Sequence, residues 1–149
     1  MFRQLLVGSA ISLCNIAIHA VVMTSIVRLA RDIGTTKTID PRLHQLWLLT
    51  AVMVPIVSAL MIVHFLEVFV WALAYLFVDA TPAGHDVLYF AFVNYTTLGY
   101  GDITPVERWK LLGPVTAMNG VLLFGWSTAF VYAVLRRVLA HIIPDLGTR

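Results

Sequence analysis

The chain has 149 residues, of which 60% are hydrophobic and 12% are charged, and its mean hydropathy is +0.87. A soluble domain of this length needs more polar surface, so the composition predicts a membrane protein. The single cysteine, Cys14, excludes an intrachain disulfide, and the formal net charge of +2 is too small to indicate a nucleic-acid partner.

The first apolar run extends from Leu5 to Leu29 and, besides His19 and Arg28 near its end, contains only small or mildly polar interruptions. At 1.5 Å per residue it covers about 37 Å, which is enough to cross a hydrocarbon core of about 30 Å. It is too long for the apolar part of a signal peptide, and no small residues near Ala20 mark a cleavage site. We therefore expect residues 1–30 to form a retained N-terminal transmembrane helix.

The second apolar run extends from Leu46 to Val78, after a polar segment at 31–45 that we expect to be a cytoplasmic loop. Its length of about 50 Å is too great for a simple crossing. We expect either a kink at Pro55 or a first part that lies in the headgroup region. Residues 46–78 are thus predicted to form a second transmembrane helix.

The segment between the second and third runs is not uniformly polar. Residues 79–85 are typical of an exposed turn, and Asp86 is placed to cap a short apolar helix, which we expect at 86–96. Such a helix spans only about half a bilayer, and the glycine-rich residues 97–101 follow it. Irregular backbone is tolerated at membrane depth only inside protein or beside water, so the pattern predicts a re-entrant loop.

The third apolar run, Leu111–Leu139, covers about 43 Å and predicts a third transmembrane helix, followed by a short tail at 140–149. Seven basic residues lie at the end of the first run and in the loop after it, or at the end of the third run and in the tail: Arg28, Arg31, Lys37, Arg42, Arg136, Arg137 and Arg149. The opposite side holds only Arg3, Arg108 and Lys110. The positive-inside rule therefore places the amino terminus outside and the carboxyl terminus in the cytoplasm.

The stretch Thr97-Leu98-Gly99-Tyr100-Gly101-Asp102 resembles the selectivity filter of potassium channels, usually written T-V/I-G-Y/F-G-D. The likeness includes the short helix before it, Pro105 and Trp109 after it, and a glycine in the following helix. It covers about half of the chain, roughly 63–139. The block 64–67 also resembles small bacterial proteins of the ion-channel family, whereas the first helix has no counterpart in the two-helix type.

The resemblance implies an all-α membrane protein with three transmembrane helices, a re-entrant pore helix and a filter loop, assembled as a four-fold homotetrameric pore. Residues 46–139 would form the pore domain, with 46–78 as the outer helix and 111–139 as the inner helix. It implies passive, selective K⁺ conduction in the cell membrane, which is not an enzymatic activity. K⁺ and lipid are the implied partners, with no cofactor besides the ion and no nucleic acid.

The residue chemistry agrees with this implication, because a dehydrated K⁺ needs rings of oxygen ligands. Backbone carbonyls of Thr97, Leu98, Gly99 and Tyr100, with the Thr97 hydroxyl, would supply these rings. Gly99 and Gly101 permit the backbone dihedrals that point successive carbonyls one way. Leu98 would then point back towards the pore helix, and Tyr100 would brace the filter from behind.

Asp102 closes the filter on its outer side, and two roles are compatible there. Several copies would form an acidic ring that concentrates cations at the outer mouth. Alternatively, Asp102 is a structural carboxylate that accepts a hydrogen bond from Tyr89 or from a backbone N–H. Some members of the family place a glutamate four residues before the filter threonine as its partner, and here that position is Val93.

The third run carries further candidates for gating or for lining the inner cavity. The resemblance suggests Gly120 as a hinge, whereas close helix packing is the alternative reading. The remaining candidates in the cavity set, carried over by spacing, are Val121, Phe124, Gly125 and Thr128. Phe124 would form a hydrophobic constriction, and Asn119 would either face the cavity or bond a neighbouring helix.

Glu67 lies within the second run, where an ionised carboxylate is costly and is a functional candidate by default. His64 precedes it by one turn on the same face. One hypothesis is a proton-sensitive pair that couples pH to opening. The other, which we favour, is a hydrogen-bonded link from Glu67 and His64 to the pore-helix region. We further expect Trp71, Tyr75 and Trp109 near the outer membrane interface and Trp47 near the inner one.

Two other functions remain open at this point. A non-selective monovalent cation channel would result if Leu98 or the missing partner at position 93 loosens the filter. A non-conducting, channel-like membrane subunit would use the same fold as a scaffold.

Overall fold

The structure, a computed structural model, describes residues 1–33 and 41–142, and within these ranges the side chains of residues 1–28, 47 and 49–140. The described part holds three long helices, one short helix, one 3₁₀ turn and no β-strand. The elements are α1 (Phe2–Ile33), α2 (Pro41–Phe77), α3 (Val87–Tyr95), η1 (Glu107–Trp109) and α4 (Leu112–Ile142). Residues 34–40 of the expected loop and 143–149 of the expected tail lie outside the described residues, whereas 31–33 and 41–45 belong to α1 and α2 and 140–142 belong to α4.

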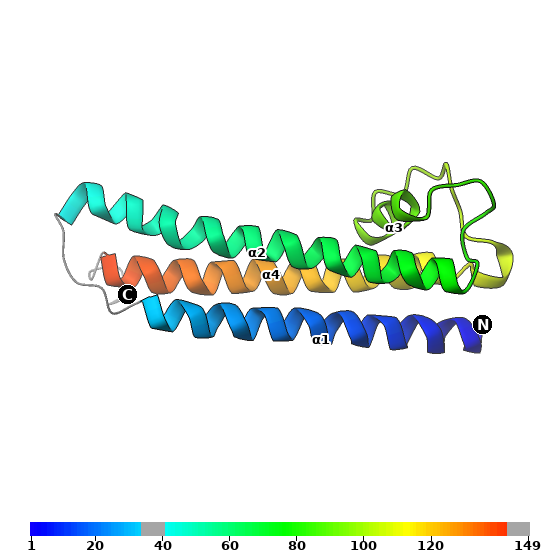
Figure 1. The fold of residues 1–149 in the computed structure, drawn as a ribbon, viewed down its shortest axis with the longest axis horizontal. Helices are drawn as coiled ribbons and strands as arrows, with labels where there is room; N and C mark the ends of the chain where they lie inside the picture. The colour runs from blue at the N-terminus through cyan, green and yellow to red at the C-terminus, as the bar shows by residue number, and fades with distance from the viewer. Residues whose placement is uncertain (34–40, 143–149) are drawn as a thin grey trace.

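The three long helices lie side by side and alternate in direction, so the start of α1, the end of α2 and the start of α4 share one end of the bundle (Figure 1). Each contains a stretch long and apolar enough to cross a membrane: Phe2–Arg28, Leu49–Phe77 and Glu107–Ala140. The expectation of an all-α protein with three membrane-spanning helices is therefore confirmed.

Helix boundaries follow local signals. Asp86 caps α3 as predicted, because its carboxylate accepts hydrogen bonds from the backbone N–H groups of Leu88 and Tyr89. The start of the second helix differs from the prediction: α2 begins at Pro41 rather than at residue 46. Proline suits the first helical position, where its missing N–H is not needed. α2 is assigned as one helix through Pro55.

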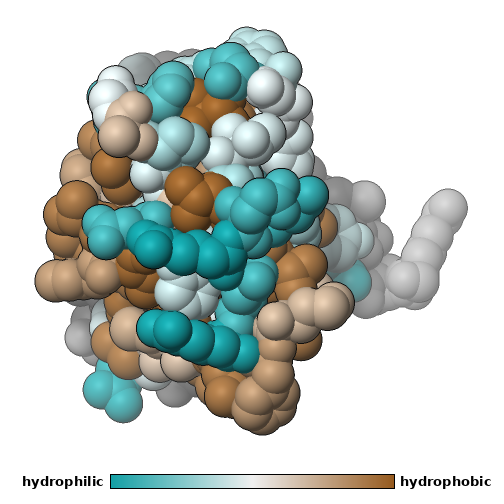
Figure 2. Space-filling view, turned by 90° about the vertical axis from the view of Figure 1, so that its right-hand side faces the viewer, coloured by the Kyte–Doolittle hydropathy of each residue, from teal (hydrophilic) through white to brown (hydrophobic). Residues whose placement is uncertain are grey.

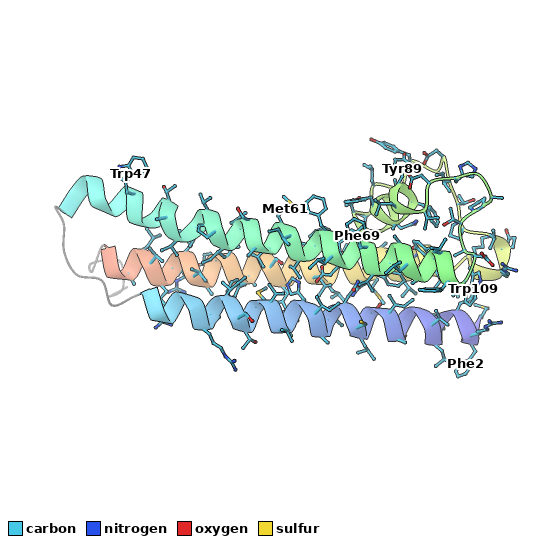
Figure 3. The ribbon with its side chains drawn as sticks, in the orientation of Figure 1. Phe2, Trp47, Met61, Phe69, Tyr89 and Trp109 are labelled. Carbon is cyan, nitrogen blue, oxygen red and sulfur yellow. The ribbon has the colours of Figure 1, made fainter. Side chains whose placement is uncertain are left out.

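The outer surface of the bundle is apolar. Met61 and Phe69 point outward from the side of α2, and Phe2 and Trp47 lie near opposite ends of the molecule (Figure 3). Figure 2 looks onto the end that carries the N-terminus and shows a band of hydrophilic side chains between hydrophobic flanks. This distribution suits helices that contact lipid along their sides and water at their ends.

The short α3 lies beside α2 and α4 at the end of the bundle where α1 begins (Figure 1). Its last residue, Tyr95, donates its hydroxyl to Glu67 of α2, and the Tyr95 carbonyl lies against Gly120 of α4. Glu67 is ten residues from the end of α2 at Phe77, and Gly120 is eight residues from the start of α4 at Leu112. At 1.5 Å per residue, the end of α3 reaches about 12–15 Å into the bundle.

α1 contacts η1, Leu111 and the start of α4 at three points. The Arg3 guanidinium lies 5.2 Å from the centre of the Trp109 ring, and Gln4 Oε1 accepts a hydrogen bond from the Leu111 N–H at 2.8 Å. A Cβ built on Gly8 would lie 2.8 Å from Cγ1 of Val115, so the two helices approach closely there. α1 thus packs against the pore domain that the sequence predicts.

The placement of Trp71 and Tyr75 near the outer membrane interface stays a prediction, but their side chains face the protein interior rather than lipid. Both side chains are fully buried in a cluster with Phe90, Tyr95 and other residues, and their polar atoms bond within the protein. The Trp71 indole N–H donates to Asn119 Oδ1 at 2.9 Å, and the Tyr75 hydroxyl lies 2.6 Å from Thr116 Oγ1. Partners on α4 therefore replace the water that an interface would supply.

Candidate functional site

The filter segment, residues 97–101, follows α3 directly and has an alternating backbone. Thr97, Gly99 and Gly101 have positive φ angles of 60°, 55° and 79°, whereas Leu98 and Tyr100 between them do not. Alternation between left- and right-handed residues turns successive peptide groups the same way. A left-handed β-branched threonine is unusual and costs conformational energy, and such outliers concentrate at functional sites.

The N–H groups at the start of the filter segment bond to the end of α3. The Thr97 N–H donates to the Asn94 carbonyl at 3.1 Å, and the N–H groups of Leu98 and Gly99 share the Val93 carbonyl at 3.0 and 3.4 Å. Within residues 1–33 and 41–142, no backbone hydrogen bond outside the helices ends on a carbonyl of the filter segment. Those oxygens therefore keep their lone pairs for another ligand.

The side chains of the filter segment are exposed in the single chain. Leu98 is 52% exposed and Tyr100 is 70% exposed. The orientations expected for Leu98, back towards the pore helix, and for Tyr100, bracing the filter from behind, stay predictions. The described residues leave much of these two side chains uncovered, because α3 packs against α2 and α4 with residues such as Phe90 and Tyr95.

Asp102 has a specific partner just beyond the filter segment. Its Oδ2 accepts a hydrogen bond of 2.8 Å from the Tyr89 hydroxyl, the partner considered from the sequence. This hydrogen bond raises the pKa of the Tyr89 phenol, since ionisation would remove the donated proton and bring two negative charges together. Both groups remain solvent-accessible, so Asp102 is still available to cations.

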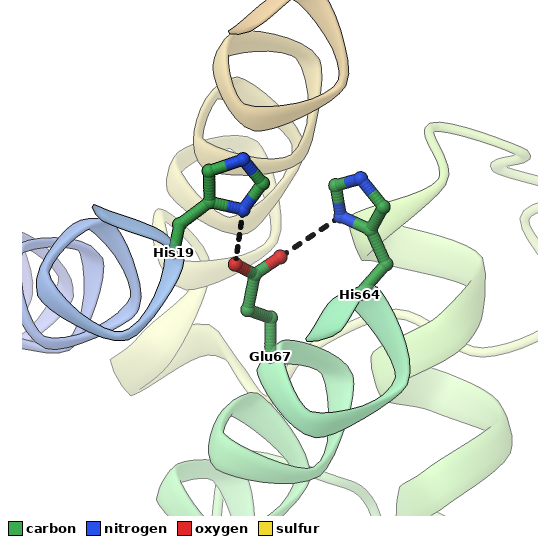
Figure 4. Close-up of side chains that lie close together, drawn as sticks. All are labelled: His19, His64 and Glu67. Atoms are coloured by element: carbon green, nitrogen blue, oxygen red, sulfur yellow. Dashed lines mark hydrogen bonds and ion pairs between the residues drawn. The ribbon is translucent and has the colours of Figure 1, made fainter. Parts of the chain in front are cut away.

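A buried polar cluster lies behind α3, centred on Glu67. The Glu67 carboxylate contacts His19 Nδ1 at 2.8 Å and His64 Nδ1 at 2.9 Å (Figure 4), and it also accepts the Tyr95 hydroxyl. Glu67 and His19 are fully buried, and His64 is largely so. The hydrogen-bonded link between Glu67, His64 and the pore-helix region is present, and it extends further than the sequence indicated.

Ser127 of α4 completes the cluster. Its Oγ lies 3.0 Å from His64 Nε2 and 3.2 Å from His19 Nε2. Glu67, His19, Ser127 and His64 thus form a closed ring of polar contacts, which we call the four-residue ring. It draws together α1, α2 and α4, while Tyr95 ties α3 to it.

Asn119 takes the second of its two expected roles, because it bonds neighbouring helices. Its Oδ1 accepts from Asn15 Nδ2 at 3.1 Å as well as from Trp71, and it is 1% exposed. Asn15 also donates to the Glu67 carbonyl at 3.3 Å. This second polar group therefore adds another link between α1, α2 and α4 next to the four-residue ring.

Gly120 is a site of close approach. A Cβ there would overlap the backbone carbonyl oxygen of Tyr95, so only glycine lets α4 and the end of α3 come this close. A Cβ on Gly125, by contrast, would meet nothing within 4 Å. The contact with Tyr95 therefore supports close packing as the role of Gly120. α4 continues as one helix through both glycines.

The remaining candidates on α4 divide between two faces. Val121, Gly125 and Thr128, at i, i+4 and i+7, are exposed in the single chain. Phe124 is on the other side, with its ring 4.6 Å from the His64 ring and 5.4 Å from the Tyr95 ring. The expected constriction by Phe124 is therefore not supported, because aromatic packing against His64 and Tyr95 of the same chain holds this side chain.

Sequence reasoning missed His19, Asn15 and Ser127 as members of the polar cluster. A signal for two of them was present. Asn15 and His19 are four residues apart in an otherwise apolar run, which places two polar side chains on one helical face. Polar groups that share a face of a membrane helix usually point towards protein.

These features define a multi-pass membrane protein in which a short helix and an irregular backbone segment enter a helical bundle from one end. The family model for the ion channel family matches residues 47–137, more than half of the chain, so the protein belongs to that family. Neither a curated protein nor a solved structure matches the chain. The match covers α3, η1 and most of α2 and α4, and it excludes α1.

Proposed function

We propose that the protein is a potassium-selective channel in which the filter segments of a homotetramer surround one axis. The carbonyls of Thr97, Leu98, Gly99 and Tyr100 then form stacked oxygen rings that replace the water around K⁺. The observation that carries this proposal is the backbone of the filter segment. The φ angles alternate in sign along this segment, and the N–H groups of its first residues are bonded to carbonyls of α3. Both features favour filter carbonyls that point away from α3.

The depth and exposure of the filter segment support assembly. Tyr95 lies about 12–15 Å into the bundle by helix rise, and the filter segment follows it. Irregular backbone at such depth needs protein or water around it. A single chain leaves Leu98 and Tyr100 exposed, and further copies around an axis would cover them while enclosing a water-filled path.

In this assembly the end of the bundle that carries α3 faces the exterior of the cell membrane, and the carboxyl terminus is cytoplasmic. The excess of lysine and arginine at the other end supports that orientation. Asp102 then lies at the outer mouth, and Val121, Gly125 and Thr128 face the inner cavity. Conduction is passive and uses K⁺ alone.

The test is ion flux from liposomes that contain the purified full-length chain, measured with K⁺ and with Na⁺, and with and without external Ba²⁺. Barium-sensitive K⁺ flux with little Na⁺ flux is the expected result. Equal flux of both ions would replace the proposal with a non-selective cation channel. Absence of flux for either ion at several pH values, together with a monomeric state in detergent, would favour a non-conducting subunit.

A further inference from the structure

The four-residue ring needs one proton more than an ionised Glu67, two neutral histidines and Ser127 can supply. Its four contacts, each 2.8–3.2 Å long, run from Glu67 to His19, from His19 to Ser127, from Ser127 to His64 and back to Glu67. Each contact needs one hydrogen between its two polar atoms. A neutral imidazole brings one N–H, and a serine brings one O–H, so two histidines and Ser127 supply three hydrogens. The fourth contact requires one more proton.

The same extra proton balances the charge. An ionised Glu67 with two neutral histidines leaves a net charge of −1 inside the bundle, where solvation is poor. The titratable groups that face the ring are His19 from α1, Glu67 and His64 from α2, and Tyr95 from α3, whereas α4 contributes Ser127. In the described part of the chain, the ion-pair partners of Glu67 are these two histidines. One bound proton therefore makes the ring neutral and closes it.

Loss of that proton breaks a particular contact. Hydrogen bonds to a carboxylate are stronger than those between neutral groups, so both Nδ1–H groups stay directed at Glu67. Both Nε2 atoms are then acceptors, and Ser127 can donate to only one of them. The lost contact is one of the two by which Ser127 of α4 bonds to α1 and α2, while Tyr95 keeps its bond to the carboxylate.

We propose that the four-residue ring is a binding site for a single proton, through which pH sets how firmly α4 is held to α1 and α2. The consequence for conduction rests on the proposed channel function, and the binding of the proton does not. The ligand atoms of His19, His64 and Glu67 lie within 4.8 Å of one another, which a divalent metal also tolerates. However, pairwise N–O contacts of 2.8 and 2.9 Å suit shared protons, and a metal would have to separate the pairs.

The first measurement reports the proton without any flux. The His19 ring lies 5.3 Å from the Trp126 ring, and a protonated imidazole quenches indole fluorescence at such a distance. Fluorescence of the full-length protein in detergent is recorded between about pH 5 and 8, the range in which imidazole titrates. We expect a one-proton transition that disappears in Trp126→Phe, which assigns the signal.

Ser127→Ala tests the ring itself. The hydroxyl makes two contacts in the protonated ring and one after proton loss, so its removal weakens proton binding by one hydrogen bond. The fluorescence midpoint should move about one pH unit towards acid. His64→Gln, which opens the ring from α2, should shift it in the same direction and serves if Ser127→Ala does not fold. Ser127→Thr should restore the midpoint, and Ser25→Ala, an exposed serine on α1, should leave it unchanged.

A fluorescence signal independent of pH, or an unchanged midpoint in both Ser127→Ala and His64→Gln, would overturn the proton site. Zn²⁺ that binds stoichiometrically to wild type and not to His64→Gln would overturn it in favour of a metal site. Flux from liposomes should follow the fluorescence midpoint in wild type and in Ser127→Ala. If Ser127→Ala shifts the fluorescence midpoint but leaves the pH dependence of flux unchanged, the coupling of the proton to the pore is refuted. If the fluorescence titrates but no flux occurs at any pH, only the proposed channel function is refuted.

Discussion

Gly120 gives the sharpest test of how α3 is held. In Gly120→Ala the new methyl group would overlap the carbonyl oxygen of Tyr95 and would lie 3.0 Å from its carbonyl carbon. Both atoms are backbone, and the Tyr95 side chain is buried with its hydroxyl on Glu67, so this residue has little room to move. Overpacking of this kind costs about 1–3 kcal/mol, and we take the upper end because no flexible side chain can yield.

Helix propensity acts in the opposite direction. Alanine in a helix interior is favoured over glycine by about 1 kcal/mol, which leaves a net loss of about 2 kcal/mol for each chain in Gly120→Ala. Gly125→Ala on the same helix gains the propensity term without the overlap, because nothing lies within 4 Å of its Cβ. The two variants should therefore differ by about 3 kcal/mol, with wild type between them.

The assay is thermal unfolding of the purified protein in detergent, with K⁺ and Na⁺ flux measured on the same samples. We expect a lower Tm and impaired K⁺ selectivity in Gly120→Ala, and an equal or higher Tm with normal selectivity in Gly125→Ala. If Gly120→Ala is as stable as Gly125→Ala and only its opening is impaired, the contact with Tyr95 is irrelevant and a hinge at Gly120 explains the glycine.

Three further predictions concern the filter segment and its supports. Gly101→Ala should abolish K⁺ selectivity. Gly84→Ala is the matched control, because the φ of Gly84 is 82°, close to the 79° of Gly101, and a Cβ meets nothing at either position. Both variants should lose about 1–2 kcal/mol of stability to backbone strain, but Gly84→Ala should keep normal flux. Tyr95→Phe removes a hydrogen bond to a buried carboxylate and should lower the free energy of unfolding by about 2 kcal/mol, and an unchanged denaturation curve would contradict this. Asp102→Asn should let Tyr89 ionise at lower pH, because the hydrogen bond to Asp102 raises the pKa of Tyr89 in the wild type. This hydrogen bond stabilises the folded wild type at pH values below the ordinary tyrosine pKa, and the stabilisation is lost as the pH rises through the raised pKa. Ultraviolet absorbance of the phenolate, with Tyr89→Phe as reference, measures this shift, and identical titrations in wild type and Asp102→Asn would refute it.

The helices were predictable because their signals are local. Apolar run length indicated the three spans, and Asp86 before an apolar stretch indicated where α3 begins. The start of α2 was not predictable from hydropathy, because polar residues continue a helix beyond the membrane as readily as apolar ones. Run length defines a span in lipid, whereas capping residues and proline define the ends of a helix.

The polar cluster was only half predictable. His64 and Glu67 are one turn apart on one helix, so their contact follows from helical geometry. The contact between Glu67 and His19 joins positions 48 residues apart, and Ser127 lies 108 residues from His19. Which faces of two apolar helices meet depends on packing, and a nearly uniform apolar run carries little information about its inner face.

The position of His19 on α1 has a consequence for how the protein enters the membrane. α1 is synthesised before α2, so an imidazole is already in the bilayer when the Glu67 segment leaves the translocon. Insertion of an acidic side chain at the centre of a membrane helix costs about 3 kcal/mol, and a waiting partner reduces that cost before α3 and α4 exist. The helix outside the matched family region would then act first as an insertion aid for α2 and only later as a packing partner of α4.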